Sequence, residues 1–248
     1  MRYPSQNMST SAAKMLATAT LLAAILAATP ACSSSGMGAE LSATPTARAL
    51  PANAARPLRL PADEKFSIVF SPSQRAPGLD GEAEASAIAS DSGNAEARAR
   101  VARSGSASGT FQLGHVVKNE SASQIDLNCH IHAKYAYDAK SAPATGKRDA
   151  SVALRLFARD QRNRQLRAID LLVHGTDQGD ASSEVEKDLR ITLTLSPGDA
   201  ASVFLAGSAE ANTTMAQSAS ASLNLSGLKM EFESHPAPPT SAPAGGNK

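Results

Sequence analysis

IDLNCHIHAKYAYD, residues 125–138, is the stretch that decides the fold class of this chain. Apolar residues stand at every second position from Ile125 to Tyr137, and most positions between them are polar or charged. Successive side chains of a β-strand point to opposite faces of the sheet, whereas a helix repeats its apolar positions every three to four residues. The stretch therefore predicts a strand with one buried and one solvated face.

The same alternation recurs in shorter segments on both sides of this strand, and turn signals separate them. The polar residues 160–164 predict a hairpin, and Ser-Pro-Gly-Asp at 196–199 fits a type II turn in which glycine supplies the positive φ. Segments 82–89 and 95–101 alternate alanine with charged or polar residues, and we expect strands there with a shallow face of methyl groups. The segments with larger apolar residues are 66–70, 111–117, 152–156, 169–173, 189–195, 203–205, 219–225 and 228–232.

About eight to ten short strands with turn signals and no convincing helix predict an all-β fold, an antiparallel two-sheet sandwich. Residues 63–234 are long enough to form one domain with a core of its own. On either side of it, residues 32–62 and 235–248 are rich in Ala, Ser, Thr and Pro. We expect these two segments to be a disordered tether and a disordered tail.

The N-terminus carries a targeting pattern. Two basic residues precede an apolar run of 14 residues, 15–28, which is shorter than the roughly 20 residues that span a bilayer as a helix. Ala31 and Cys32 follow. Residues 1–35 resemble the bacterial lipoprotein signal, and this resemblance implies a signal peptide over 1–31, lipidation of Cys32 and attachment of the protein to a membrane. An ordinary signal peptide cut after Ala31 is the alternative, and it implies a secreted protein.

Composition narrows the classes of function. Without residues 1–31 the chain has 22 basic and 23 acidic residues, so no overall field attracts nucleic acid, and we expect no nucleic-acid partner. The chain has no tryptophan and three tyrosines, which disfavours a platform for stacking bases or sugars. Its two cysteines cannot form a disulfide framework. We expect no cofactor.

The polar face of the strand at 125–138 holds the best candidate for a metal site. His130 and His132 leave the same face about 6.5–7 Å apart along the backbone, a spacing at which both rings can reach one metal ion. Asp126 shares that face, and His174 is a further ligand only if its strand is adjacent. The alternative is two solvated histidines on an open sheet face.

Five arginines around one hairpin suggest a surface that binds anions, because guanidinium groups match carboxylate and phosphate. An acidic surface polymer or an envelope protein is then the partner. The alternative is a solvated hairpin whose charge prevents pairing between sheet edges. The five residues are Arg155, Arg159, Arg162, Arg164 and Arg167.

Catalytic patterns are weak. Ser226 and Lys229 match the Ser-x-x-Lys pattern of penicillin-recognising enzymes, but they lie in a strand-like region and the companion motifs are absent. Cys129 is in phase with the apolar stripe, and we interpret it as an inert buried thiol. His115 is in phase with its apolar neighbours too, and we expect a hydrogen-bonded inward residue.

These observations predict an exported, lipid-anchored, non-catalytic interaction or structural module of the bacterial cell envelope, at the outer membrane or in the periplasm. A metal-binding exported protein is the first alternative. A cell-envelope enzyme is the second.

Overall fold

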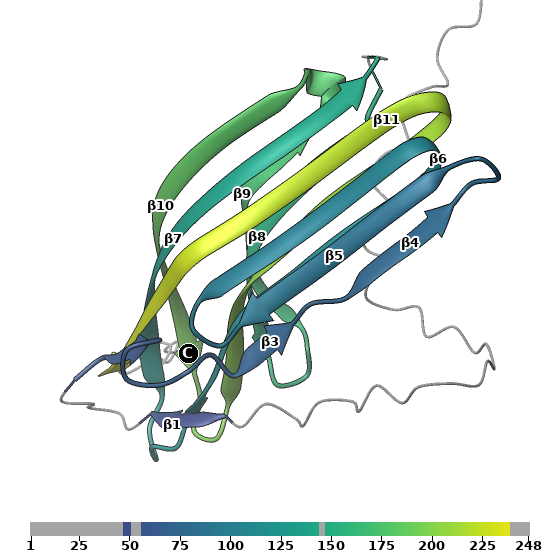
Figure 1. Ribbon diagram of the computed structural model, residues 1–248. Coiled ribbons are helices and arrows are strands. Elements are labelled where there is room, and N and C mark those ends of the chain that lie inside the picture. Colours follow the sequence, from purple (N-terminus) through teal and green to yellow (C-terminus); the bar gives the residue numbers. More distant parts are fainter. Residues whose placement is uncertain (1–46, 51–55, 144–146, 239–248) are drawn as a thin grey trace, which may run out of the picture. The chain divides into compact units, whose positions relative to one another are not determined.

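Eleven strands join into one hydrogen-bonded sheet in the computed structural model, which describes residues 47–50, 56–143 and 147–238 (Figure 1). One short 3-10 helix, η2 (Thr176–Gln178), accompanies them. The strands are β1 (Arg48–Leu50), β2 (Leu58–Leu60), β3 (Ile68–Phe70), β4 (Ser73–Pro77), β5 (Glu82–Ser90), β6 (Asn94–Asn119), β7 (Ile125–Ala142), β8 (Ala150–Asp160), β9 (Gln165–Gly175), β10 (Ala181–Leu195) and β11 (Ala200–Pro236).

The sheet is folded over on itself, because its two longest strands turn back in the middle. Figure 1 shows β11 and β6 each curving over at the same edge of the molecule. The turn in β6 contains Arg103 and Gly105, which both have positive φ, 71° and 138°. The pairing of β11 with β6 shifts register between Thr213 and Gln217 at the same place. We call this edge the folded edge.

Folding the sheet produces two layers, whose strands pair antiparallel except for β1, which runs parallel to β6. Layer 1 runs in the order β5, the first half of β6, the second half of β11, β7, β10. Layer 2 has β3 and β4, the second half of β6, the first half of β11, β8 and β9. The connections β4–β5, β7–β8 and β9–β10 also pass from one layer to the other at the folded edge. The predicted all-β sandwich is thus confirmed, and its two layers belong to one continuous sheet.

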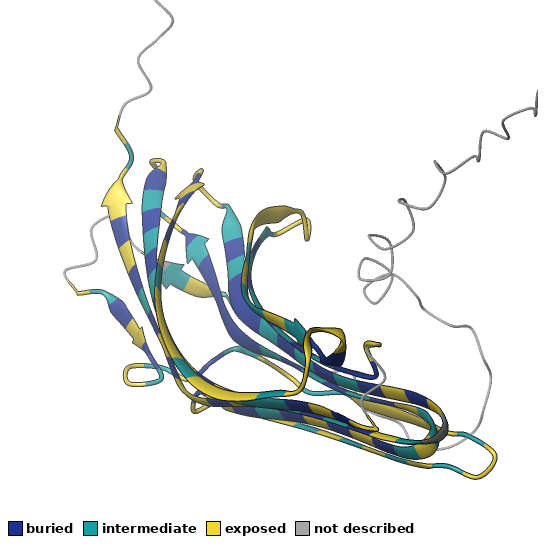
Figure 2. Ribbon diagram, turned by 90° about the horizontal axis from the view of Figure 1, so that it is seen from above, coloured by how far each residue is buried: buried dark blue, intermediate teal, exposed yellow. Residues whose placement is uncertain are grey.

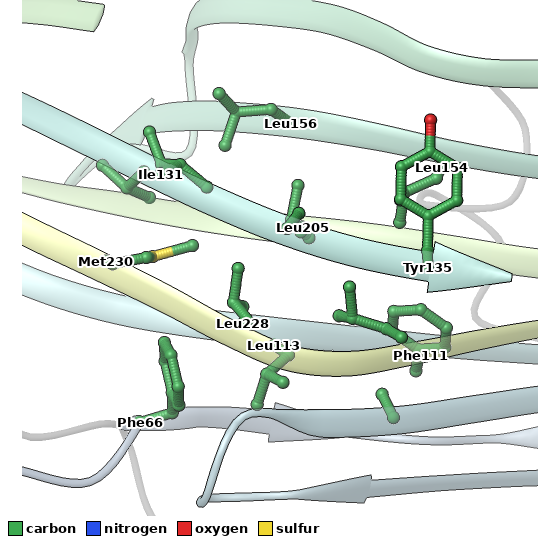
Figure 3. Close-up of a cluster of buried hydrophobic side chains, with 14 of the residues drawn as sticks. Phe66, Phe111, Leu113, Ile131, Tyr135, Leu154, Leu156, Leu205, Leu228 and Met230 are labelled. Atoms are coloured by element: carbon green, nitrogen blue, oxygen red, sulfur yellow. The ribbon is translucent and has the colours of Figure 1, made fainter. Parts of the chain in front are cut away.

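Side-chain size sets the distance between the layers. Many of the inward positions nearest the folded edge are alanine or glycine, although Val101, Val152 and Thr213 are also buried there, so the two backbones can approach closely. Farther from the edge the inward residues are leucine, isoleucine and aromatic residues, which fill the wider part of the core (Figure 3). The small inward residues are Ala99, Ala107, Gly109, Ala139, Ala150, Ala209, Ala211, Ala219 and Ala221, and the larger ones include Phe111, Leu113, Tyr135, Leu154, Leu156, Leu205 and Leu225.

The strand predicted at 125–138 is confirmed as β7, whose residues alternate between buried and more exposed positions from Ile125 to Ala136. Figure 2 shows the same banding along the other long strands. The alanine-rich segments form β5 and the first half of β6, paired with each other. The hairpin at 160–164 is present, and Gly198 has a φ of +81° in the turn predicted at 196–199.

The predicted boundaries of the domain need correction. Part of the segment expected as a tether, 32–62, lies in the sheet, since β1 pairs with β6 and β2 pairs with β11. Leu58 and Leu60 are 9% and 2% exposed, because they alternate with an outward arginine as strand residues do. At the other end, Pro236 pairs with Ile125, so the sheet continues past residue 234.

The signal peptide at 1–31 and the lipidation site Cys32 lie outside the described residues, and both remain expectations. Within the part of the chain that is described, no helix has the length and apolar character needed to cross a bilayer.

Candidate functional site

His130 and His132 lie on the outer face of layer 1, as their phase in β7 predicts. Both rings face the same carboxylate on β10: His132 Nδ1 lies 3.1 Å from Asp188 Oδ1, and His130 Nε2 lies 3.5 Å from that atom. His132 Nε2 is also 3.5 Å from Glu186 Oε1. The two histidines are thus part of a surface network of polar contacts between β7 and β10.

The other proposed metal ligands lie elsewhere. Asp126 is four residues from His130 along β7, about 13 Å at the usual strand rise, and it accepts a hydrogen bond from Thr194 Oγ1 at 2.8 Å. His174 is in layer 2, where its Nε2 is 2.9 Å from the Gly179 carbonyl oxygen. Among the described residues no group of three or more His, Cys, Asp or Glu side chains is arranged to hold a metal ion.

Two inward residues have the orientation that the sequence predicts. Cys129 is 1% exposed, and burial raises the pKa of its thiol to about 12, so the reactive thiolate is scarce near neutral pH. His115 is fully buried, 6.2 Å from the ring of Phe232. The expectation of a hydrogen-bonded His115 stays a prediction: neither ring nitrogen has a well-aligned partner among the described residues, but the Lys65 backbone lies close enough to act on the ring. Burial lowers the pKa of His115 and keeps the ring neutral.

Ser226 and Lys229 lie in β11, at a register shift in its pairing with β7. Gly227, between them, has a positive φ of 71°. The Ser226 hydroxyl donates to the Lys134 carbonyl at 3.4 Å, and both residues are exposed on the outer face of layer 1. The penicillin-recognising pattern needs its serine at the start of a helix, which this strand does not supply.

The arginine hairpin is formed by β8 and β9 in layer 2, and two of its five arginines are paired with carboxylates. Arg155 Nε lies 2.5 Å from Asp170 Oδ1, and Arg164 Nε lies 2.6 Å from Asp160 Oδ2. Asp160 also accepts backbone hydrogen bonds within the turn, so it organises the hairpin as well as offsetting charge. The other three arginines have no carboxylate partner among the described residues.

Arg159 has a distinct environment. Its guanidinium carbon lies over the rings of Phe157 and Phe204, 5.2 and 5.4 Å from their centroids. The two rings stack with centroids 5.5 Å apart, and Arg159 Nη1 donates to Asn163 Oδ1 at 2.9 Å. Sequence reasoning missed both phenylalanines. The available signal was that Arg155, Phe157 and Arg159 alternate with buried residues and so share the outer face of β8.

The rest of this outer face of layer 2 lies between β3 and β8. Its outward residues there include Gln112, Gly114 and Ala206. Phe70 on β3 is 55% exposed at the far side of the face. The outer face of layer 2 therefore carries the exposed ring of Phe70 on β3 and the guanidinium groups of Arg155 and Arg159 on β8, whereas Arg167 pairs with inward Ala158.

Comparisons with known proteins add little to this geometry. No family model and no curated protein matches the chain. One of the matching solved structures is that of TmCBM61 in complex with beta-1,4-galactotriose, 8% identical, covering 62% of this chain and 90% of that chain with a TM-score of 0.17. A TM-score this low supports no argument about the present chain. The fold and the face define the class: a β-sandwich domain with one basic, aromatic outer face.

Proposed function

We propose that this protein is an exported, lipid-anchored, non-catalytic interaction module of the bacterial cell envelope, which binds its partner with the outer face of layer 2. The observation that carries the proposal is the grouping of Phe70, Phe157 and the arginines of β8 on that face. Aromatic and arginine side chains are the residue types that dominate binding surfaces. An acidic surface polymer or an envelope protein fits such a surface.

Other chemically suggestive residues have structural surroundings that favour a binding role over catalysis. Cys129 is buried, and the Ser226 hydroxyl donates a hydrogen bond to a backbone carbonyl. The rings of His130 and His132 both contact the carboxylate of Asp188. The leader expected at 1–31 and Cys32 support export and anchoring, and the location we propose is the outer membrane or the periplasm. Secretion without lipid is the alternative outcome for the anchor.

Two measurements test the proposal. Labelling cells with a radioactive fatty acid should mark the wild type and leave Cys32→Ala unlabelled in the soluble fraction; an unlabelled, soluble wild type would refute the anchor. A photo-crosslinking amino acid in place of Phe70 should capture an envelope component. The same group in place of Ile88, 64% exposed on the outer face of layer 1, is the matched control. Equal capture at both positions contradicts a role for the face.

A further inference from the structure

β10 lies at one margin of the sheet and has the longest uninterrupted free edge among the described strands (Figure 1). It pairs with β7 from Ala181 to Leu195 without a register shift, and its sequence contains no proline or glycine. Its other side carries unpaired backbone N–H and C=O groups, which are a template for a further strand. On the same flank β9 is irregular, because two register shifts interrupt its pairing with β8. β10 is therefore the edge of this flank that a further strand can join.

The inward side of β10 is only partly covered by layer 2. Tyr135 on β7 donates a hydrogen bond to the Leu171 carbonyl oxygen of β9 at 3.0 Å, so at this point β9 lies opposite β7, and β10 lies one strand farther out. The inward residues Val185 and Leu189 of β10 are half-buried, whereas Ile131, which pairs with Leu189, is fully buried. The edge thus combines free backbone groups with apolar side chains that its own domain does not fully cover.

The outward charges of β10 complement those of a second copy. When two copies pair antiparallel about Leu189, Asp188 of each copy lies opposite Arg190 of the other. Arg190 has no carboxylate partner among the described residues, so its charge is free for this contact. In the same register Glu184 and Glu186 face threonines of the second copy, and no two like charges are opposed. Opposite charges directly across an antiparallel pair stabilise it, and like charges destabilise it.

The edge strand on the other flank, β5, lacks this complementarity. Its outward side carries Glu82 and Glu84 and no basic residue, so two copies would gain no pair of opposite charges. On β10 itself, Lys187 is an exposed charge on the inward side, a feature that discourages unspecific edge pairing. In the register about Leu189 it faces Ile191 of the second copy, and its long side chain can keep the ammonium group in water. We therefore expect a specific but weak association.

We propose that two copies of this chain associate by antiparallel pairing of their β10 strands about Leu189, which joins layer 1 of both copies into one continuous sheet. The contact is isologous and occupies the β10 edge of both copies, so association through it stops at a dimer. The dissociation constant expected for such a small, charged interface is of the order of micromolar. The dimer depends neither on the outer face of layer 2 nor on the lipid anchor.

Disulfide trapping tests the register. In full-length Cys32→Ser protein Cys129 is buried, and Leu189→Cys adds one further thiol. The two new cysteines face each other at the twofold axis, close to disulfide distance, so oxidation should give a covalent dimer. Val185→Cys is the matched control, because it is also half-buried on the inward side of β10. It would face Leu193, with its own copy about 27 Å away along the strand, and should remain monomeric.

Charge exchange tests the contact between Asp188 and Arg190, with sedimentation equilibrium as the assay. Asp188→Arg opposes arginines in the dimer and Arg190→Asp opposes aspartates, so each variant alone should dimerise at least about tenfold more weakly than wild type. A mixture of the two variants restores both pairs of opposite charges, and it should form a heterodimer about as tight as the wild-type dimer. Glu84→Arg, on the edge strand β5, is the control and should leave the dissociation constant unchanged.

Three results would overturn the inference: wild type that stays monomeric up to about 100 μM, equal cross-linking of Leu189→Cys and Val185→Cys, or a mixture of the charge variants that does not associate. A monomeric wild type would leave the β10 edge to a strand of another protein. The cysteine variants keep all charges of β10 and so give a result even if a charge variant is poorly folded. The proposed function fails separately, when the crosslinker at Phe70 captures nothing beyond its control.

Discussion

Replacing Gly109 with alanine tests how closely the two layers approach at the folded edge. Gly109 lies on the second half of β6, facing the first half of the same strand. A Cβ atom added there would lie 3.0 Å from both the backbone nitrogen and the carbonyl oxygen of Arg98, and still closer to the carbonyl oxygen of Ser86. These are backbone atoms of the opposite layer, so no flexible side chain can move aside.

Two effects of opposite sign determine the magnitude. The φ of Gly109 is outside the left-handed region, and at such a position Gly→Ala alone stabilises by about 0.4–1 kcal/mol through the unfolded chain. Overpacking a close-packed core costs about 1–3 kcal/mol. The expected net result is a destabilisation of about 0–2.6 kcal/mol. For a domain of this size that lowers Tm by up to roughly 10 °C.

The assay is chemical and thermal unfolding of wild type, Gly109→Ala and Ser108→Ala. Ser108 is the neighbouring outward residue, and its substitution should change the free energy of unfolding by less than about 0.5 kcal/mol. A gain in stability for Gly109→Ala would refute the close stacking of the layers. The sign of the change in the free energy of unfolding therefore decides whether the two layers are closely stacked at Gly109 or lie farther apart there.

Three further predictions concern the core. Burial lowers the pKa of His115 below 6.5, so the unfolded chain binds a proton that the folded domain does not, and the free energy of unfolding should fall as pH drops below about 6.5, by up to about 1.4 kcal/mol per pH unit. Urea unfolding of wild type and His115→Leu at several pH values isolates this slope as the difference between the two proteins. Parallel stability profiles of the two proteins would disprove it. In a Cys32→Ser background, Cys129, with its pKa raised to about 12, should react with a thiol reagent at pH 8 only after denaturation; rapid reaction of the folded protein would contradict its burial. Phe232→Ala should cost about 3–5 kcal/mol in unfolding experiments because its ring is fully buried, and a cost below about 1 kcal/mol would show that the core is loosely packed there.

Strand positions were predictable because period-two alternation reports the face of each residue directly. The period in 125–138 identified β7, and the weaker alternation of alanines identified β5 and the first half of β6. The turning back of β6 and β11 was not predictable, because a strand keeps the same alternation when it bends. The small inward residues at 99, 107 and 109 were visible in the sequence, but their meaning depends on partners that only the pairing reveals.

For the candidate sites too, the sequence predicted the face on which a side chain lies but not its partners on other strands. The shared face of His130 and His132 followed from spacing alone, while their common partner Asp188 comes from β10, more than fifty residues away. The cluster of arginines was evident from composition. Which of them are neutralised depends on cross-strand neighbours, and the support of Arg159 by Phe204 depends on β11 lying beside β8.

The two continuous strands also decide which parts of the domain are separable. In a sandwich whose sheets are joined only by loops, each sheet uses its own strands. Here β6 and β11 each contribute one half to both layers, so no cut in the remaining connections yields two complete sheets. The layers can move apart only if both long strands straighten at the folded edge. Any fragment or circular permutant that retains the basic face must therefore retain the whole of β6 and β11.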